Sequence, residues 1–301
     1  LMVESRIEQE MSGETLFCPV CGTSVERGMK HCPTCGAKLS FTICPGCHRP
    51  VVAEKFCPFC GTRLMPTSWK GIILMYLITV GSFFLLGVIA IVLLIALVVS
   101  FILISPIDPY TAIQMSNDFA FIYLALMNVS ELIFLIPLIV YFKTPKKMLR
   151  AVGFVKQRIL SSIPEEIVYA LLGLFVSVIL QSTLFYLGVI DVTPSVYSLN
   201  IYIMLALSLV VVAFSEEALF RGFFYQALSY RYNWIIAAVI SSIIFATVHP
   251  IYPTFIIAFL LGIVMCIIYE KSGKNLMSST LFHYTYNLTI FVFPTILYLL
   301  S

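Results

Sequence analysis

Three ionisable side chains, Glu216, Glu217 and Arg221, lie within a segment that is otherwise apolar enough to cross a membrane. A charged group at the centre of a bilayer costs roughly 2.5–3.5 kcal/mol on insertion scales unless it is paired, solvated or neutralised. Ionisable residues at this depth are therefore functional-site candidates by default. The pattern E-E-x-x-x-R is the first candidate site of this chain.

The spacing within the polar clusters indicates which side chains share a helix face. Glu217 and Arg221 are four residues apart, so they can form an ion pair on one face of a helix. Glu216 would then be left free, rotated by about 100° around the helix axis. His283 and Asn287 show the same spacing on a later apolar segment and should project together.

These groups, together with His249, are the parts needed to hydrolyse an amide. Glu216 can act as the general base that activates water, and His249 can hold that water or shuttle the proton. His283 and Asn287 can donate hydrogen bonds to the developing oxyanion. Two other readings stay open: Glu216, His249 and His283 could hold a catalytic metal, or the clusters could be ion pairs and hydrogen bonds of packing alone.

Other hydrolytic designs fit the sequence less well. There is neither an H-E-x-x-H zinc helix nor a G-x-S-x-G nucleophile elbow. Several remaining polar residues and one cysteine within the spans are interpreted as packing residues: Asn128, Glu131, Gln181 and Cys266.

The composition indicates a polytopic membrane protein. Of the 301 residues, 60% are hydrophobic and only 11% are charged, and the net charge of +3 is too small to suggest a nucleic-acid partner. The first 30 residues hold no apolar stretch, so we expect no cleavable signal peptide. The apolar stretches of sufficient or nearly sufficient length are 71–104, 119–142, 165–189, 199–229, 233–249, 253–270 and 276–299.

The predicted fold class is thus an all-α polytopic membrane protein with seven transmembrane helices, or eight if the last stretch is divided near His283. Basic residues between the spans set the orientation. They occur before the first span and in alternate loops, which predicts a cytoplasmic N-terminus and a C-terminus outside. The second cytoplasmic loop, 143–164, is read either as a basic loop or as an amphipathic helix on anionic lipid.

Counting residues from the cytoplasmic ends of the spans places the clusters at comparable depth. With a rise of about 1.5 Å per residue, Glu216 lies roughly 22 Å deep, His249 roughly 27 Å, His283 roughly 13 Å and Asn287 roughly 20 Å. Polar groups from three spans therefore fall in one broad layer that a cytoplasmic cavity could reach.

Eight of the nine cysteines form four C-x-x-C pairs ahead of the first span: Cys18/Cys21, Cys32/Cys35, Cys44/Cys47 and Cys57/Cys60. Such knuckles direct two thiolates at one metal, so consecutive pairs predict a tandem zinc ribbon with two structural Zn²⁺ ions. A disulfide framework is the alternative, but it requires an oxidising compartment, which a cytoplasmic head lacks. His31 and His48 each adjoin a cysteine and could replace a ligand, although we read them as bystanders.

Taken together and in this order, E-E-x-x-x-R, F-x-x-x-H and H-x-x-x-N resemble the CPBP (CaaX protease and bacteriocin-processing, or Abi) family, over about residues 165–290. Its eukaryotic members are the type-II CaaX prenyl endopeptidases. The resemblance implies an intramembrane protease that cleaves near the C-terminus of a lipidated or membrane-bound substrate, with Glu216 as base, His249 beside the water and His283 and Asn287 at the oxyanion. It implies Glu217 and Arg221 as supporting residues and no catalytic metal.

The predicted organisation is a flexible N-terminus (1–17), zinc ribbon 1 (18–39), zinc ribbon 2 (44–64), a linker (65–70) and a CPBP-like protease domain (71–301). The expected partners are membrane lipid, a lipidated and possibly prenylated substrate, and an unidentified protein that the ribbons recruit. The alternative functions are a non-catalytic scaffold or bacteriocin-immunity-type protein on the same fold, and a metal-dependent intramembrane protease.

Overall fold

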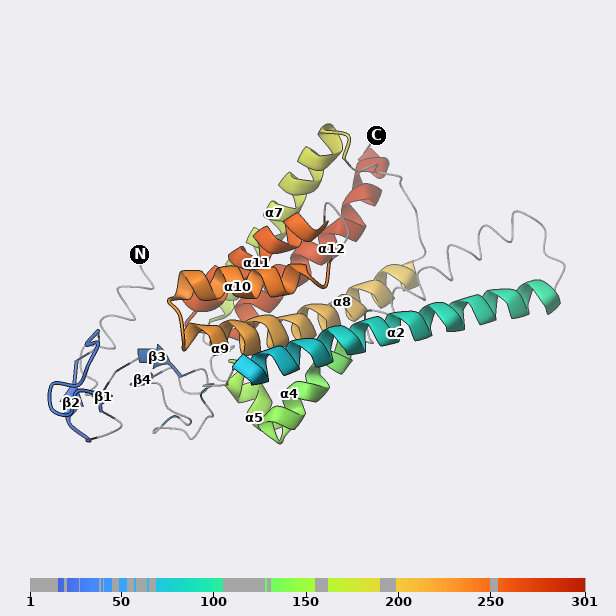
Figure 1. Cartoon of the computed structure of the whole chain (residues 1–301). Coiled ribbons are helices and arrows are strands. Elements are labelled where there is room, and N and C mark those ends of the chain that lie inside the picture. The colour runs from blue at the N-terminus through green and yellow to red at the C-terminus, as the bar shows by residue number, and fades with distance from the viewer. Residues whose placement is uncertain are drawn as a thin grey trace.

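A computed structural model describes most of the membrane body and part of the head (Figure 1). The described residues are 16–18, 21–26, 28–37, 39, 41–44, 49–52, 57, 64, 69–104, 128, 131–154, 162–189, 199–249 and 254–300.

The head consists of two small antiparallel hairpins. The first pairs β1 (Leu16–Phe17) with β2 (Ser24–Val25), and the second pairs β3 (Phe41–Ile43) with β4 (Pro50–Val52). β4 also contacts β1, and Val52 joins the small apolar cluster of the first hairpin. The two hairpins are thus packed together.

The body is helical throughout its described part. Its elements are α2 (Trp69–Ile104), η1 (Glu131–Phe134), α4 (Leu135–Phe142), α5 (Pro145–Ala151), α7 (Ile163–Tyr186), α8 (Leu199–Leu219), the π-helix η2 (Phe220–Tyr225), α9 (Gln226–Ser229), α10 (Trp234–Ala246), α11 (Thr254–Lys271) and α12 (Leu276–Leu300). This confirms the all-α membrane fold expected from the sequence, with its small cysteine-rich head.

Helix bounds agree with the predicted spans to within a few residues at most ends. By length and composition, four of the described helical stretches could cross a membrane: 69–93, 163–186, 201–229 and 254–271. α12 is a single helix through His283 and Asn287, so it gives no support to the divided last span of the eight-span alternative. Within the second predicted span, only Asn128 and residues from Glu131 onward are described, and 119–127 lie outside the described residues.

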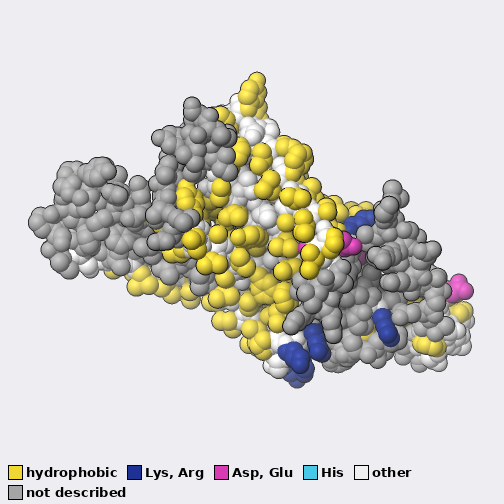
Figure 2. Space-filling model, turned by 180° about the vertical axis from the view of Figure 1, so that it is seen from behind, with side chains coloured by type: hydrophobic (Ala, Val, Ile, Leu, Met, Phe, Trp, Pro, Cys, Tyr) yellow, Lys and Arg dark blue, Asp and Glu magenta, His cyan; other side chains and the backbone are white. Residues whose placement is uncertain are grey.

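The outer surface is unusually apolar. Leu85 and Leu93 on α2 and Phe175 on α7 are each about 60% exposed, and hydrophobic side chains cover much of the described face in Figure 2. Exposed apolar surface on this scale would be unfavourable in water, but it suits contact with lipid tails. The chain is an integral membrane protein.

The interior is organised around α8. α10 and α11 form one helix pair, α7 and α12 form another, and α8 contacts α12 while its continuation η2 packs against α10 and α11 (Figure 1). Among the described side chains of α2, only Ile72, Met75 and Thr79, near its start, are buried. The polar clusters on α8, α10 and α12 are therefore brought together from segments that are distant in sequence.

The end of α5, the segment α9 and the start of α12 meet at one end of the bundle. The carbonyl of Ala151, at the end of α5, accepts a hydrogen bond from Gln226 Nε2 on α9 at 2.9 Å. The carbonyl of Gly153 accepts one from the backbone N–H of Leu276, the first residue of α12, at 3.2 Å. The turns predicted to be cytoplasmic are thus held side by side.

α5 occupies part of the loop for which the sequence left two readings open. Thr144 caps it by accepting a hydrogen bond from the Lys147 backbone N–H at 3.2 Å, and Pro145 begins the helix. Its apolar residues Met148 and Ala151 are buried in the protein core. α5 therefore places its apolar side against the bundle.

The α7–α12 contact leaves no room for a side chain at Gly173. A Cβ there would lie 2.3 Å from both the Phe282 carbonyl oxygen and Thr285 Oγ1. The backbones of the two helices can approach this closely only because residue 173 is glycine.

We predict that Gly173→Ala destabilises the protein by about 1–3 kcal/mol, because the added methyl group overpacks a backbone contact. The measurement is the midpoint of thermal unfolding of the purified protein in detergent. Gly87→Ala on α2 is the matched control, since a Cβ at Gly87 meets no atom of the described structure within 4 Å. Equal midpoints for the two variants would contradict this account of the helix contact.

Candidate active site and zinc centre

Glu217 and Arg221 form a fully buried ion pair. Arg221 Nη1 lies 2.9 Å from Glu217 Oε1, and the two side chains are 1% and 0% exposed. Arg221 also donates from Nη2 to the Gly262 carbonyl on α11 at 3.3 Å, and its guanidinium lies 4.5 Å from the centre of the Phe245 ring. One cation thus connects α8, α10 and α11.

The segment that carries Arg221 is a π-helix. η2 follows α8 directly, and all six of its residues are buried. A π-helical segment shifts the register of side chains relative to a regular α-helix, and such segments are frequent at functional sites. The segment is closely packed, since a Cβ at Gly222 would lie 2.5 Å from Val152 Cβ.

His283 lies between the two adjacent glutamates of α8. Its Nδ1 is 3.0 Å from Glu217 Oε1, and its Nε2 is 3.4 Å from Glu216 Oε2. His283 is 5% exposed and Glu216 is 4% exposed. The candidate base Glu216 therefore faces the imidazole of His283 on α12. The sequence had predicted only that Glu216 would stay outside the Glu217–Arg221 ion pair.

His249 approaches the same region from the turn that follows α10. Its Nδ1 lies 3.2 Å from the Phe245 carbonyl oxygen, and its ring packs on the Phe245 ring at a centroid distance of 4.8 Å. The Phe245 ring also meets the His283 ring edge-on, at a centroid distance of 6.0 Å. In the turn before His249, Thr247 accepts a hydrogen bond from Tyr76 of α2 at 3.0 Å.

Asn287 lies one turn beyond His283 on α12 and is partly buried. Within the described part of the chain, its amide has no hydrogen-bond partner. This leaves the amide available to a ligand, and the helix spacing places it on the face of α12 that carries His283.

Sequence reasoning had assigned no role to Phe245, which begins the F-x-x-x-H pattern. The structure places its ring between Arg221, His249 and His283. The spacing from Phe245 to His249, one helical turn, is the signal that could have indicated the contact between those two rings.

The residues interpreted as packing residues have structural partners where the structure describes them. Gln181 donates to Ser177 at 2.8 Å, Asn128 donates to Ser208 at 3.0 Å, and Cys266 is fully buried in the core. Glu131 differs, because its Oε2 is buried without a hydrogen-bond partner among the described residues.

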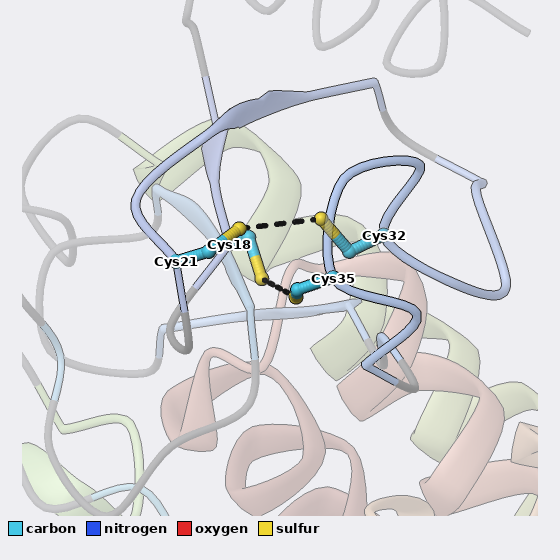
Figure 3. Close-up of side chains that lie close together, drawn as sticks. All are labelled: Cys18, Cys21, Cys32 and Cys35. Atoms are coloured by element: carbon cyan, nitrogen blue, oxygen red, sulfur yellow. Dashed lines mark hydrogen bonds between the residues drawn. The ribbon is translucent and has the colours of Figure 1, made fainter.

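In the head, four cysteines of the first ribbon form a compact cluster (Figure 3). The sulfur atoms of Cys18, Cys21, Cys32 and Cys35 all lie within 4.8 Å of one another. Cys18 Sγ is 3.7 Å from Cys35 Sγ, and Cys21 Sγ is 3.5 Å from Cys32 Sγ. A tetrahedral zinc with bonds of about 2.3 Å would separate its sulfurs by about 3.8 Å, so the cluster fits zinc.

The surroundings of Cys21 favour the thiolate that a metal requires. The Thr23 hydroxyl, 3.3 Å from Cys21 Sγ, and the Thr23 backbone amide lower the pKa of Cys21 to about 6. In the second ribbon, Cys44 and Cys57 are described and buried, whereas Cys47 and Cys60 lie outside the described residues. His31 is exposed, and His48 also lies outside the described residues.

Two family models match the chain. Residues 198–289 match the model described as type II CAAX prenyl endopeptidase Rce1-like, and residues 18–61 match the double zinc ribbon. The chain contains an Rce1-like domain, C-terminal to a double zinc ribbon. This confirms the resemblance that the motifs indicated, and the segment 198–289 includes every residue of the candidate active site.

Neither the curated proteins nor the solved structures include a significant match to this chain. The Rce1-like domain supports an intramembrane protease of the CAAX type, and the ribbon match together with the cysteine cluster supports zinc binding.

We predict that Arg221→Met destabilises the protein by about 3–5 kcal/mol, because it leaves the Glu217 carboxylate buried without its cation. Thermal unfolding in detergent, followed as the loss of monodisperse protein, measures the effect. The double variant Glu217→Gln/Arg221→Met is the control and should be more stable than Arg221→Met alone. A double variant that is less stable than Arg221→Met would contradict the pairing.

Proposed function

We propose that this protein is an intramembrane endopeptidase in which Glu216 activates a water molecule to cleave a peptide bond near the C-terminus of a membrane-associated substrate. The observation that carries the proposal is the position of Glu216 Oε2, 3.4 Å from His283 Nε2, inside an Rce1-like domain. A buried carboxylate beside an imidazole can accept a proton from water and pass it on.

The buried ion pair orients His283 for this role. With Nδ1 donating to Glu217, the Nε2 edge of the imidazole is directed at Glu216. When His283 is protonated, its charge and that of Arg221 balance the two carboxylates, and Nε2 is a donor. His283 and Asn287 then donate hydrogen bonds to the oxyanion that forms on the scissile carbonyl.

The proposed role of His249 is to bind and orient the water molecule. Because the Phe245 carbonyl lies 3.2 Å from Nδ1, that nitrogen carries the proton and Nε2 is left as an acceptor. His249 Nε2 and the Glu216 carboxylate together can hold a water by its two hydrogens. Glu216 takes one proton as the water oxygen bonds to the carbonyl carbon, and that proton goes to the amine nitrogen as the C–N bond breaks.

The substrate proposed is a lipidated protein of the prenylated CaaX type, presented to a site that opens to the cytoplasm. The turns predicted to be cytoplasmic lie together at one end of the body. Tyr230 at that end packs against a buried cluster of the second ribbon, which supports a cytoplasmic N-terminus and a C-terminus outside. In this arrangement ribbon 1 (18–39) and ribbon 2 (44–64) each hold one Zn²⁺, and they recruit a substrate or partner to the protease domain (71–301).

We predict that Glu216→Gln lowers the rate of peptide cleavage by at least about 100-fold, because the amide cannot accept the proton of water. The assay is cleavage of a farnesylated CaaX peptide by the full chain in proteoliposomes. Glu165→Gln, a matched change of an exposed glutamate on α7, should retain the full rate. Undiminished cleavage by Glu216→Gln would overturn the assignment of the base.

If the wild-type protein leaves the farnesylated peptide intact, the prenylated substrate class is wrong. Proteolysis is then tested separately by comparing C-terminal peptides from cells that carry the wild-type chain or the Glu216→Gln variant.

The metal-dependent alternative predicts a different metal content. We expect two zinc ions per chain in both the wild-type protein and Glu216→Gln, because cysteines alone bind them. Elemental analysis of the purified full chain measures this number. A third ion that is lost in Glu216→Gln would favour a metal at the active site.

A further inference from the structure

His249 lies in the short turn that ends α10, so the shape of this turn decides where its imidazole lies. The backbone N–H of His249 donates to the Ala246 carbonyl at 2.9 Å, and the preceding residue makes the same kind of bond at 3.3 Å. Bonds that span three residues are tighter than those of an α-helix, so the chain is already leaving the regular helix here. The position of His249 therefore depends on what holds the turn.

Thr247, two residues before His249, holds this turn with its side chain. Its hydroxyl donates to the Ile244 carbonyl at 2.6 Å, and its oxygen accepts a hydrogen bond from the Tyr76 hydroxyl on α2 at 3.0 Å. Because the Thr247 proton is committed to Ile244, the proton between the two hydroxyls belongs to Tyr76. The two bonds form a chain that runs from α2, through the side chain of Thr247, to the backbone of α10.

The surroundings of Tyr76 give its hydroxyl a fixed position. The Tyr76 ring packs against the main hydrophobic core, to which Phe245 and Val248 also belong. Both hydroxyls lie within the apolar body, where little water is present to replace a lost hydrogen bond. Removing the Tyr76 hydroxyl would therefore free the turn to move relative to α2.

The other contacts of the His249 ring orient it without holding the turn. Its Nδ1 lies 3.2 Å from the Phe245 carbonyl oxygen, and its ring packs on the Phe245 ring at a centroid distance of 4.8 Å. Both contacts are made with a residue of the preceding helical turn of the same helix. Among the described residues, the polar contact of this turn with another helix is the one between Thr247 and Tyr76.

We propose that Tyr76 is a positioning residue for His249, acting through Thr247 to hold the imidazole where it and Glu216 can bind the same water. The inference rests on the proposed function, because the position of His249 affects the rate only in that reaction. Tyr76 lies outside the segment 198–289 that matches the Rce1-like model, so α2 contributes to the site from beyond the matched segment. A misplacement of a reacting group by about 1 Å can cost about 100-fold in rate.

The first test compares Tyr76→Phe with the wild-type chain in the cleavage of the farnesylated CaaX peptide in proteoliposomes. The change removes one oxygen and keeps the ring, so we expect kcat to fall by about 10-fold while KM stays within about twofold. Tyr186→Phe, at the exposed end of α7, is the matched control and should keep both constants. An unchanged kcat, or a rise in KM alone, would overturn the proposal.

A double-mutant cycle tests whether Tyr76 acts through Thr247. Thr247→Val should lower kcat at least as much as Tyr76→Phe does, and combining the two changes should cost nothing further, because the bond between the hydroxyls is already absent. Thr247→Ser keeps the hydroxyl and should restore most of the rate. Losses that simply multiply in the double variant would show that the two hydroxyls act independently, which would refute the inference.

A third measurement does not depend on whether any peptide is cleaved. The nitrogen NMR resonances of isotope-labelled histidine report the surroundings of each imidazole, and His249→Gln identifies the resonances of His249 among the four histidines of the chain. We expect Tyr76→Phe to shift or broaden the His249 signals and to leave those of His283 in place. Unchanged His249 signals would contradict the positioning role whatever the assay shows. Shifted signals in a protein that cleaves nothing would support the role of Tyr76 and count against the proposed function instead.

Discussion

The buried charge of Arg221 is the constraint on which the rest of this structure depends. A guanidinium removed from water must be compensated by an anion and by hydrogen-bond acceptors, or the fold does not form. Glu217 supplies the anion, the Gly262 carbonyl supplies an acceptor, and the Phe245 ring supplies a face for the cation. Because these partners lie on different helices, satisfying one charge fixes how α8, α10 and α11 meet.

The Glu217–Arg221 ion pair also influences the geometry of the candidate active site. Glu217 has a second neighbour, Nδ1 of His283, so the imidazole of α12 is held in one orientation, with its other nitrogen toward Glu216. An active site needs reacting groups that are fixed before substrate arrives, because reorganisation during the reaction raises the barrier. Here His283 is held by Glu217, and Glu217 is itself part of the ion pair that stabilises the fold. The geometry of the candidate base therefore depends on the packing of the helix bundle.

Local spacing was sufficient to predict some of these features. The Glu217–Arg221 pair follows from a separation of four residues, the helical spans follow from their length and hydrophobicity, and the metal centre follows from the C-x-x-C knuckles. The contact between His283 and both glutamates could not be predicted, because it depends on how α12 packs against α8. The π-helix η2 could not be predicted either, since no spacing in the sequence marks its register shift. The burial of Lys274, in the turn between α11 and α12, could not be predicted either, because sequence alone does not show that a turn is buried.

α2 has a further consequence for how the protein sits in lipid. Its 36 residues, at about 1.5 Å each, give a helix about 54 Å long, whereas the hydrocarbon core of a bilayer is about 30 Å thick. Its buried described side chains, Ile72, Met75 and Thr79, lie near its start, and Phe83 still packs against Phe134, whereas the described apolar side chains farther along the helix are mostly exposed. To keep those side chains in lipid, α2 must tilt strongly or thicken the membrane around it. The free energy of placing α2 in lipid therefore depends on bilayer thickness, and the same helix is joined near its start, through Tyr76, to Thr247 in the turn before His249.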